Sequence, residues 1–334
     1  MDVTTILVLL VEVLLFPGLL GLWVMSMFSE WWVRKLFARS QRRMGPSYVG
    51  PIGVLQPFAD FIKLLLVKTE PNYKYGSISV ARAFGCLGLG AVVASLLLLP
   101  IAPLSIAAKF DVILLVYLLG VWVAISELVM ATSLLNPFAV KGVSRLTTIL
   151  AVAEPAFFTA VLTPAYLSHR VAEPAFSVKA AVDAAWGLWT NPLTAVPMFL
   201  ATVAALIALQ SKLMLPPFNI PEAEQELIAG VATEFSGPLL AIFNFLHDAD
   251  LYALSLVVTY LLLGGPHPFI GNPVAGIVAV VIKYLAVLTI ITLIKSSFGR
   301  FRVEQGVKTL VRYALLPAVL AIVISTVLNQ LMLA

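Results

Sequence analysis

Long runs of apolar residues alternate with short polar segments along the whole chain. Each run is about 20 residues long, which is the length of an α-helix that crosses a bilayer. The pattern predicts an all-α integral membrane protein with about eight transmembrane helices. We place the spans at residues 3–28, 82–101, 111–132, 146–167, 192–214, 235–262, 273–295 and 309–332. The first run has no basic start and no cleavage site, so we expect it to remain as a span.

The composition agrees with a membrane protein and excludes several kinds of site. Of the 334 residues, 61% are hydrophobic and 11% are charged, whereas a soluble domain has about 25% charged residues. We therefore treat residues 1–334 as a single polytopic membrane domain. The one cysteine, Cys86, excludes an internal disulfide and a cysteine-ligated iron–sulfur cluster or zinc site. We expect Cys86 to be a small packing residue in an apolar helix.

Basic residues are distributed unevenly between the two sides of the predicted spans. The odd-numbered connections carry Arg34, Lys35, Arg39, Arg42, Arg43, Lys63, Lys68, Lys74, Arg82, Lys141, Arg145, Lys212, Lys295, Arg300, Arg302 and Lys308. The even-numbered connections carry Lys109, Arg170 and Lys179. The positive-inside rule then predicts that the odd connections are cytoplasmic and that both termini lie outside.

The first connection, residues 30–81, is too long for a simple turn. Its start, Glu30–Arg43, mixes basic and aromatic residues, which predicts an amphipathic helix on the cytoplasmic side with Trp31 and Trp32 among the headgroups. Gly-Pro and glycine-rich sequence follows and predicts irregular backbone. Phe58–Val67 is apolar but too short to span a bilayer.

The fifth connection, residues 211–234, is acidic. It carries Glu222, Glu224 and Glu226 at alternate positions and then Glu234. One interpretation is helix capping, with Asn219 as the cap and Glu222 at the third position of a helix. The stretch from Leu213 to Gly237 contains no Lys or Arg to neutralise the four acids. We therefore favour a functional role over capping.

Ionisable residues also lie within the predicted spans. They are Glu12, Glu127, Glu154, His247, Asp248, Asp250 and Lys283. Each charge at a bilayer centre costs about 2.5–3.5 kcal/mol on insertion scales, so this number of charges predicts a shared polar interior suited to proton relay. The alternative for a single residue is an interhelical pair, such as Lys283 with an acid. In the connection 168–191, the spacing of His169, Glu173 and Asp183 matches no metal-ligand pattern, and we expect a solvated loop there.

Three motifs stand in the first, fifth and last connections: QRRMGPSYVGPIGVLQPFADFIKLLLVKTE (Gln41–Glu70), PFNIPEAEQELIAGVATEFSG (Pro217–Gly237) and RFRVEQ (Arg300–Gln305). In sequence and order they resemble the H-type membrane coupling subunit of respiratory complex I and its relatives in membrane-bound hydrogenases and sulfane reductases. The resemblance implies a non-catalytic membrane protein of an oxidoreductase complex that couples redox chemistry to ion translocation. It implies no cofactor in this chain, and iron–sulfur clusters with a nickel–iron or related centre in partner subunits.

The resemblance and the buried charges together predict two sets of residues. The proton pathway comprises Glu127, Glu154, Glu222, Glu224, Glu226, Glu234, His247, Asp248 and Lys283. The interface with the redox arm comprises Gln41, Arg42, Arg43, Asp60, Lys63, Arg300, Arg302 and Glu304. The implied partners are hydrophilic redox-arm subunits on the cytoplasmic side, antiporter-like membrane subunits and lipid, but no nucleic acid.

Departures from the complex I pattern favour the hydrogenase and sulfane-reductase branch. Ser47-Tyr48 stands where complex I members have Asn-Arg, and Asn219 stands where they have Asp. Two alternatives remain. One is the corresponding membrane subunit of a quinone-reducing complex I, with a quinone cavity under the first and fifth connections. The other is a stand-alone proton-coupled secondary transporter, against which the absence of a repeat between the two halves counts.

Overall fold

The computed structural model describes residues 3–70, 76–101, 108–169 and 174–331, and this part of the chain is helical with no strand. Eight helical stretches are long and apolar enough to cross a membrane, which confirms the predicted all-α membrane fold. They are built from α1 (Val3–Leu14) and α2 (Leu19–Ser40), α4 (Ile78–Leu98), α5 (Asp111–Val116) and α6 (Val123–Thr132), α7 (Pro137–Ser168), α9 (Pro192–Lys212), α11 (Gly237–Val257), α12 (Pro273–Ser297), and α13 (Val303–Leu310) and α14 (Leu316–Leu331).

Three of the spans contain a π-helical turn. These turns are η3 (Tyr117–Trp122) between α5 and α6, η5 (Val258–Leu262) after α11, and η6 (Val311–Leu315) between α13 and α14. A π-helical turn widens the helix locally and is common at functional sites. Both η3 and η5 line features described below.

The first span is longer than the sequence predicts. Its backbone breaks near Pro17 and Gly18, where proline cannot donate a helical hydrogen bond, and α2 then continues unbroken to Ser40. The residues predicted as a separate surface helix are therefore the end of α2. Within α2, Trp32 Nε1 donates to Thr289 Oγ1 at 3.3 Å, which ties α2 to α12. The short helical segment that follows consists of η1 (Pro51–Gly53), α3 (Gln56–Ile62) and η2 (Lys63–Val67).

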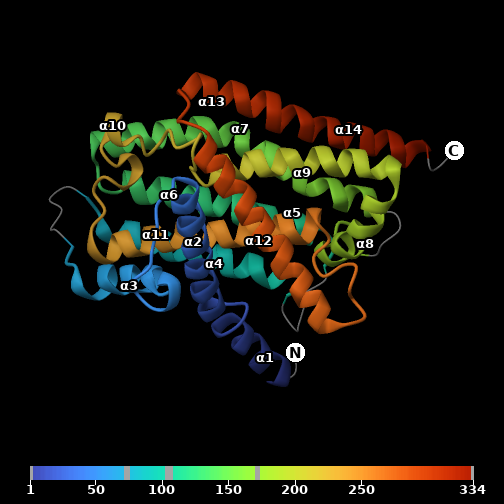
Figure 1. Cartoon of the computed structure of the whole chain (residues 1–334), viewed down its shortest axis with the longest axis horizontal. Helices are drawn as coiled ribbons and strands as arrows, with labels where there is room; N and C mark the ends of the chain where they lie inside the picture. The colour runs from blue at the N-terminus through green and yellow to red at the C-terminus, as the bar shows by residue number, and fades with distance from the viewer. Residues whose placement is uncertain (1–2, 71–75, 102–107, 170–173, 332–334) are drawn as a thin grey trace.

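The connections gather at the two ends of the bundle (Figure 1). At one end, called here the α10 end, lie α3, α10 (Glu224–Leu227) and η4 (Gly230–Ala232). Backbone hydrogen bonds join the connections there: Phe301 N–H donates to Pro217 O at 2.9 Å, and Ser77 N–H to Ser133 O at 3.0 Å. The other end, called the α8 end, carries α8 (Val178–Thr190).

Helix α11 lies at the centre of the packing. It is the most enclosed of the spans, and it contacts α2, α4 and α12. Helices α7, α9 and α14 pack against one another on one side, while α2 and α12 run at a steep angle to them (Figure 1). Large apolar side chains on the outward faces remain exposed, as a helix bundle in lipid requires.

Two local predictions are wrong. The connection 168–191, predicted as a solvated loop, contains α8, which packs on α7 and α9. Trp189 Nε1 of α8 donates to Leu262 O at 2.7 Å. Glu173, one of the polar residues of this connection, lies outside the described part of the chain. Cys86 is exposed on the outer face of α4 and does not pack inside the bundle. A helix with small residues on one face is equally compatible with lipid or with a neighbour, so the sequence did not distinguish them.

Candidate functional site

The acidic connection follows directly on α9 and is mostly irregular. No helix begins at Asn219; the single turn α10 starts at Glu224, and its cap residue is Ala223. The capping interpretation of the glutamates is therefore wrong. Asn219 Oδ1 is buried and has no hydrogen-bond partner among the described residues. An open cavity of about 550 Å³ lies beside it, lined by Pro216, Asn219, Glu222, Gln225 and Arg300.

Glu154 and Lys212 form an ion pair inside the bundle. Glu154 comes from the middle of α7 and Lys212 is the last residue of α9; their side chains are 23% and 3% exposed. Lys212 Nζ also lies 5.5 Å from the centre of the Phe157 ring. A buried ammonium needs such a partner, because an unpaired buried charge is strongly destabilising.

A third helix leaves room for this pair. Gly120, in the π-helical turn η3, faces the Glu154 carboxylate: a Cβ at this position would lie 2.6 Å from Oε2 and 3.9 Å from Lys212 Nζ. A contact of 2.6 Å to a carbon atom is too short, so a side chain would displace the carboxylate. The absence of a side chain at Gly120 therefore lets three spans meet around one ion pair.

Further acids surround Lys212. Glu127 on α6 and Asp250 on α11 are each 5% exposed. The charges that act on Glu127 are those of Asp250, Glu222, Lys212 and Glu154, and those that act on Asp250 are Lys212 and Glu154. The acids thus form one electrostatically connected group, called here the acid cluster. It consists of Glu127, Glu154 and Asp250 with Lys212, and of Glu222, whose charge acts on Glu127 and also on Lys295 of α12. It extends from the open cavity at Glu222 into the bundle.

His247 and Asp248 belong to a second group. The charges acting on Asp248 come from Glu30, Arg34 and Lys295, and Arg34 Nη1 lies 3.1 Å from Asp60 Oδ2. Two residues along an α-helix turn about 200° around its axis, so Asp248 and Asp250 lie on opposite sides of α11. This second group is therefore on the side of α2, α3 and α12, away from Lys212.

Glu226 connects three segments at the α10 end. Its carboxylate lies 2.6 Å from Arg145 Nη1 on α7 and 2.7 Å from Arg300 Nη2 just before α13. The hydrogen bond from Arg145, helped by the charges of both arginines, holds the pKa of Glu226 below its ordinary value. Glu234 contacts Asn136, the residue that caps α7. These contacts fix the acidic connection to α7 and to the segment before α13.

The remaining predicted interface residues lie at the α10 end, where most are exposed. Asp60 accepts from Gln56 Nε2 at 3.0 Å and lies 3.7 Å from Lys63. Arg302 is the N-cap residue of α13, and its N–H donates to Gln305 Oε1 at 3.1 Å. The others, Gln41, Arg42, Arg43 and Glu304, are exposed. The side chain of Glu224 lies outside the described part of the structure.

Lys283 lies apart from both groups. Its Nζ donates to the carbonyl oxygens of Leu263 at 2.7 Å, Gly265 at 2.9 Å and His267 at 2.7 Å, and lies 5.6 Å from the centre of the Trp186 ring. The expected pair with an acid is therefore replaced by three backbone carbonyls at the α8 end. Its membership of the proton pathway stays a prediction.

Several residues of these groups were not predicted from the sequence. The charge pattern predicts Lys212 as a loop residue, although its position at the end of an apolar span, directly before the glutamates, is a usable signal. Gly120 carried no signal, because nothing in one sequence shows which glycine faces a charge. Arg145 and Arg300 were visible as charges but not as partners of Glu226. Within the described residues no group of three or more His, Cys, Asp or Glu is arranged to hold a metal ion.

The fold and these groups define a class: a multi-pass helical membrane protein with polar residues leading from one end into its interior. A model of the NADH dehydrogenase family matches residues 12–326. The chain belongs to this family, which confirms the resemblance to the membrane protein of complex I. It shares its fold with a chain in the structure of the membrane-bound sulfane sulfur reductase, an archaeal respiratory membrane complex. The two chains are 24% identical with a TM-score of 0.77, and the match covers 97% of this chain and 100% of the other.

Proposed function

We propose that this chain is the membrane coupling subunit of an ion-translocating redox complex of the sulfane-reductase or hydrogenase type. The observation that carries the proposal is the acid cluster around Lys212, which leads from the open cavity at Glu222 to Glu127 and Asp250. The similarity in fold to a chain of an archaeal sulfane sulfur reductase supports the assignment to the sulfane-reductase or hydrogenase branch of the family. The chain itself would carry no redox centre; iron–sulfur clusters and a nickel–iron or related centre would belong to partner subunits.

The distribution of basic residues supports a cytoplasmic α10 end. The redox-arm subunits would then bind there, over the segments 30–81 and 211–234. Exposed polar residues such as Gln41, Arg43 and Glu304 would contact them. Antiporter-like subunits would pack beside the bundle in the membrane, where large apolar side chains are exposed.

The coupling would act through the ammonium group of Lys212. A redox event in a partner subunit changes the charge or hydration beside Glu222. Lys212 contacts Glu154 and acts electrostatically on both Glu127 and Asp250, so a change in the protonation of any one acid changes how strongly Lys212 stabilises the others. Proton exchange among these carboxylates would transmit the effect of the redox event laterally, within the plane of the membrane, to the subunits that translocate ions.

The quinone-reducing alternative is less well supported. The cavity between α2, α3 and α11, lined in part by Arg34, Asp60 and Asp248, has a volume of about 30 Å³. Pockets for small ligands usually measure about 300–1,000 Å³. The larger cavity at the fifth connection, about 550 Å³, is lined mainly by the polar or charged residues Asn219, Glu222, Gln225 and Arg300, whereas pockets for small ligands are mostly apolar. The proposal therefore assigns no substrate to this chain.

The test is to purify the intact complex from its native membrane and to assay its electron acceptor. Hydrogen evolution or sulfide formation without quinone supports the proposed branch. Quinone-dependent turnover that a quinone-site inhibitor blocks would make the chain part of a quinone-reducing complex. Isolation of the chain alone, without redox partners, would contradict both and would favour the secondary transporter.

A further inference from the structure

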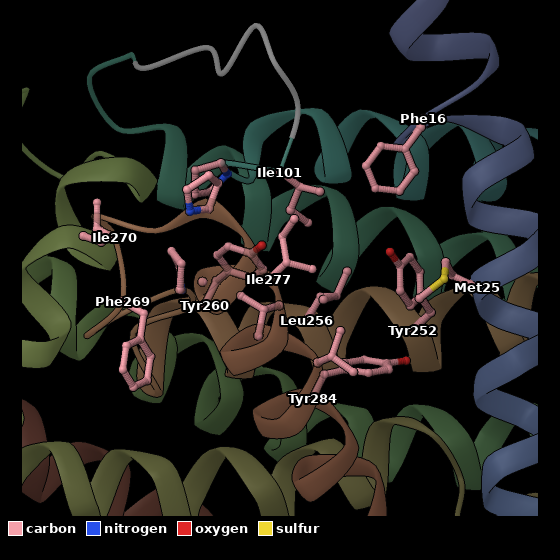
Figure 2. A pocket seen from close by; sticks show the side chains of 16 residues that line it. Phe16, Met25, Ile101, Tyr252, Leu256, Tyr260, Phe269, Ile270, Ile277 and Tyr284 are labelled. Atoms are coloured by element: carbon pink, nitrogen blue, oxygen red, sulfur yellow. The ribbon is translucent and has the colours of Figure 1, made fainter.

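A second cavity lies between α2, η5 and α12, away from the acid cluster (Figure 2). Its volume is about 500 Å³, within the range of about 300–1,000 Å³ usual for ligand pockets. Phe269 and Ile277, 54% and 65% exposed, stand at its rim, whereas Tyr252 and Tyr260, 3% and 6% exposed, stand in its interior. The cavity therefore runs from the outer surface of the bundle into its interior.

Two tyrosine hydroxyls in this cavity have no hydrogen-bond partner among the described residues. The third hydroxyl, Tyr284 Oη, is engaged by Ser29 Oγ at 2.5 Å. The hydroxyls of Tyr252 and Tyr260 make no hydrogen bond within the described part of the chain, and Figure 2 shows them directed toward the space between the two rings. Both hydroxyl oxygens are open to the cavity and are not among the enclosed polar atoms. A tyrosine hydroxyl in an apolar site usually finds a partner, so these two indicate an acceptor from outside the chain.

One wall of the cavity is held in place by Lys283. The segment that contributes Pro266, Phe269 and Ile270 to the cavity follows η5. Lys283 Nζ binds three carbonyl oxygens of the chain between Leu263 and His267. The described residues that line the cavity include no carboxylate. The site is therefore a preformed apolar chamber with two hydrogen-bond donors.

The surroundings of the rim identify the occupant. The rim residue Ile277 lies on the outer face of a membrane span, so the molecules that meet it are lipid chains. Water is a poor occupant of an apolar cavity. We propose that this cavity binds one membrane glycerolipid, with a hydrocarbon chain in the apolar part and an ester or ether oxygen that accepts hydrogen bonds from Tyr252 and Tyr260.

Photolabelling of the intact complex tests this site. The complex is placed in nanodiscs with phosphatidylcholine that carries a diazirine on one acyl chain, and crosslinked peptides are mapped by mass spectrometry. Crosslinks should concentrate on Leu256, Ile277 and Val280, which line the cavity. Ile277→Trp, which fills the entrance, should remove most of this labelling. Ile282→Trp is the matched control, because Ile282 is 62% exposed on the same helix but does not line the cavity.

The hydroxyls are tested separately. Each Tyr→Phe change at positions 252 and 260 removes one donor, which should weaken retention of the lipid about fivefold. Equal labelling of the wild type and the Ile277→Trp variant would overturn the proposal, as would displacement of the lipid by a short-chain quinone at lower concentration than by unlabelled phosphatidylcholine.

Discussion

Glu154 on α7 and Lys212 on α9 form an ion pair within the helix bundle, at a point where Gly120 of a third span has no side chain. Lys212 is 3% exposed, so its ammonium group depends on protein partners for stabilisation. The same ammonium acts on Glu127 and Asp250. One lysine thus connects acids from α6, α7 and α11.

The pair predicts an asymmetric response to charge removal. Glu154→Gln leaves Lys212 without its closest carboxylate and should destabilise the protein by about 3–5 kcal/mol, the usual cost of breaking a buried pair from one side. The double variant Glu154→Gln/Lys212→Met removes both charges and should recover most of that loss. Thermal unfolding of the intact complex measures both. A double variant no more stable than the single one would contradict the pairing.

Gly120 should tolerate no side chain. Gly120→Ala places a methyl group 2.6 Å from Glu154 Oε2, which should cost about 1–3 kcal/mol by overpacking and should reduce ion uptake into proteoliposomes. Gly90→Ala on α4 is the control, because a Cβ there meets nothing within 4 Å. Similar behaviour of the two variants would mean that Gly120 does not set the position of Glu154.

Glu226 should hold the α10 end together in a pH-dependent way. Its pKa is lowered in the folded protein from an ordinary 4.5, so its contribution to stability is complete above pH 4.5 and is lost as the pH falls through the lowered value. Glu226→Gln should speed hydrogen exchange in the segment 298–302 at neutral pH. In this variant, hydrogen exchange in the segment should no longer become faster at acid pH. The matched variant Glu304→Gln, an exposed acid in the first turn of α13, should change neither.

The Lys283→Met variant tests whether Lys283 stabilises the structure or belongs to the proton pathway. Lys283→Met leaves three carbonyl groups without their donor, each at a cost of about 1–3 kcal/mol if they stay buried, so hydrogen exchange at residues 263–268 should increase. Because Lys283 lies at the α8 end, away from the acid cluster, ion uptake per turnover should stay unchanged. Loss of uptake would instead place Lys283 in the proton pathway that the sequence predicts. Lys179→Met, an exposed lysine of α8, serves as the control.

The apolar periodicity predicts most of the fold. Span boundaries such as 111–132 were predicted because bilayer thickness fixes the length of an apolar helix. The continuation of α2 through Trp31 and Trp32 was not predicted, because charge and aromatic content do not show where a helix breaks. The same limit applies to α8, a short apolar helix whose burial against α7 and α9 depends on how those helices pack.

The acids were visible in the sequence, but their grouping was not. Which carboxylates meet depends on helix packing. Asp248 and Asp250 are two residues apart, yet they lie on opposite sides of α11 and face different charges. The charge pattern places Lys212 in a loop, so the sequence does not indicate it as the partner of these acids. The acid cluster with Lys212 draws its residues from α6, α7, α9, α11 and the connection after α9, so only the three-dimensional arrangement reveals it.

The most direct test of coupling through the acid cluster is ion uptake by proteoliposomes that contain the intact complex with Glu127→Gln. Glu127 is 5% exposed, lies within a membrane span and is not one of the predicted interface residues, so electron transfer to the acceptor should continue while ion uptake per electron is lost. Electron transfer and uptake should both be normal in Asp183→Asn, because Asp183 is an exposed acid of α8 that belongs to neither predicted set. Undiminished ion uptake per electron in Glu127→Gln would contradict the assignment of the cluster to ion translocation.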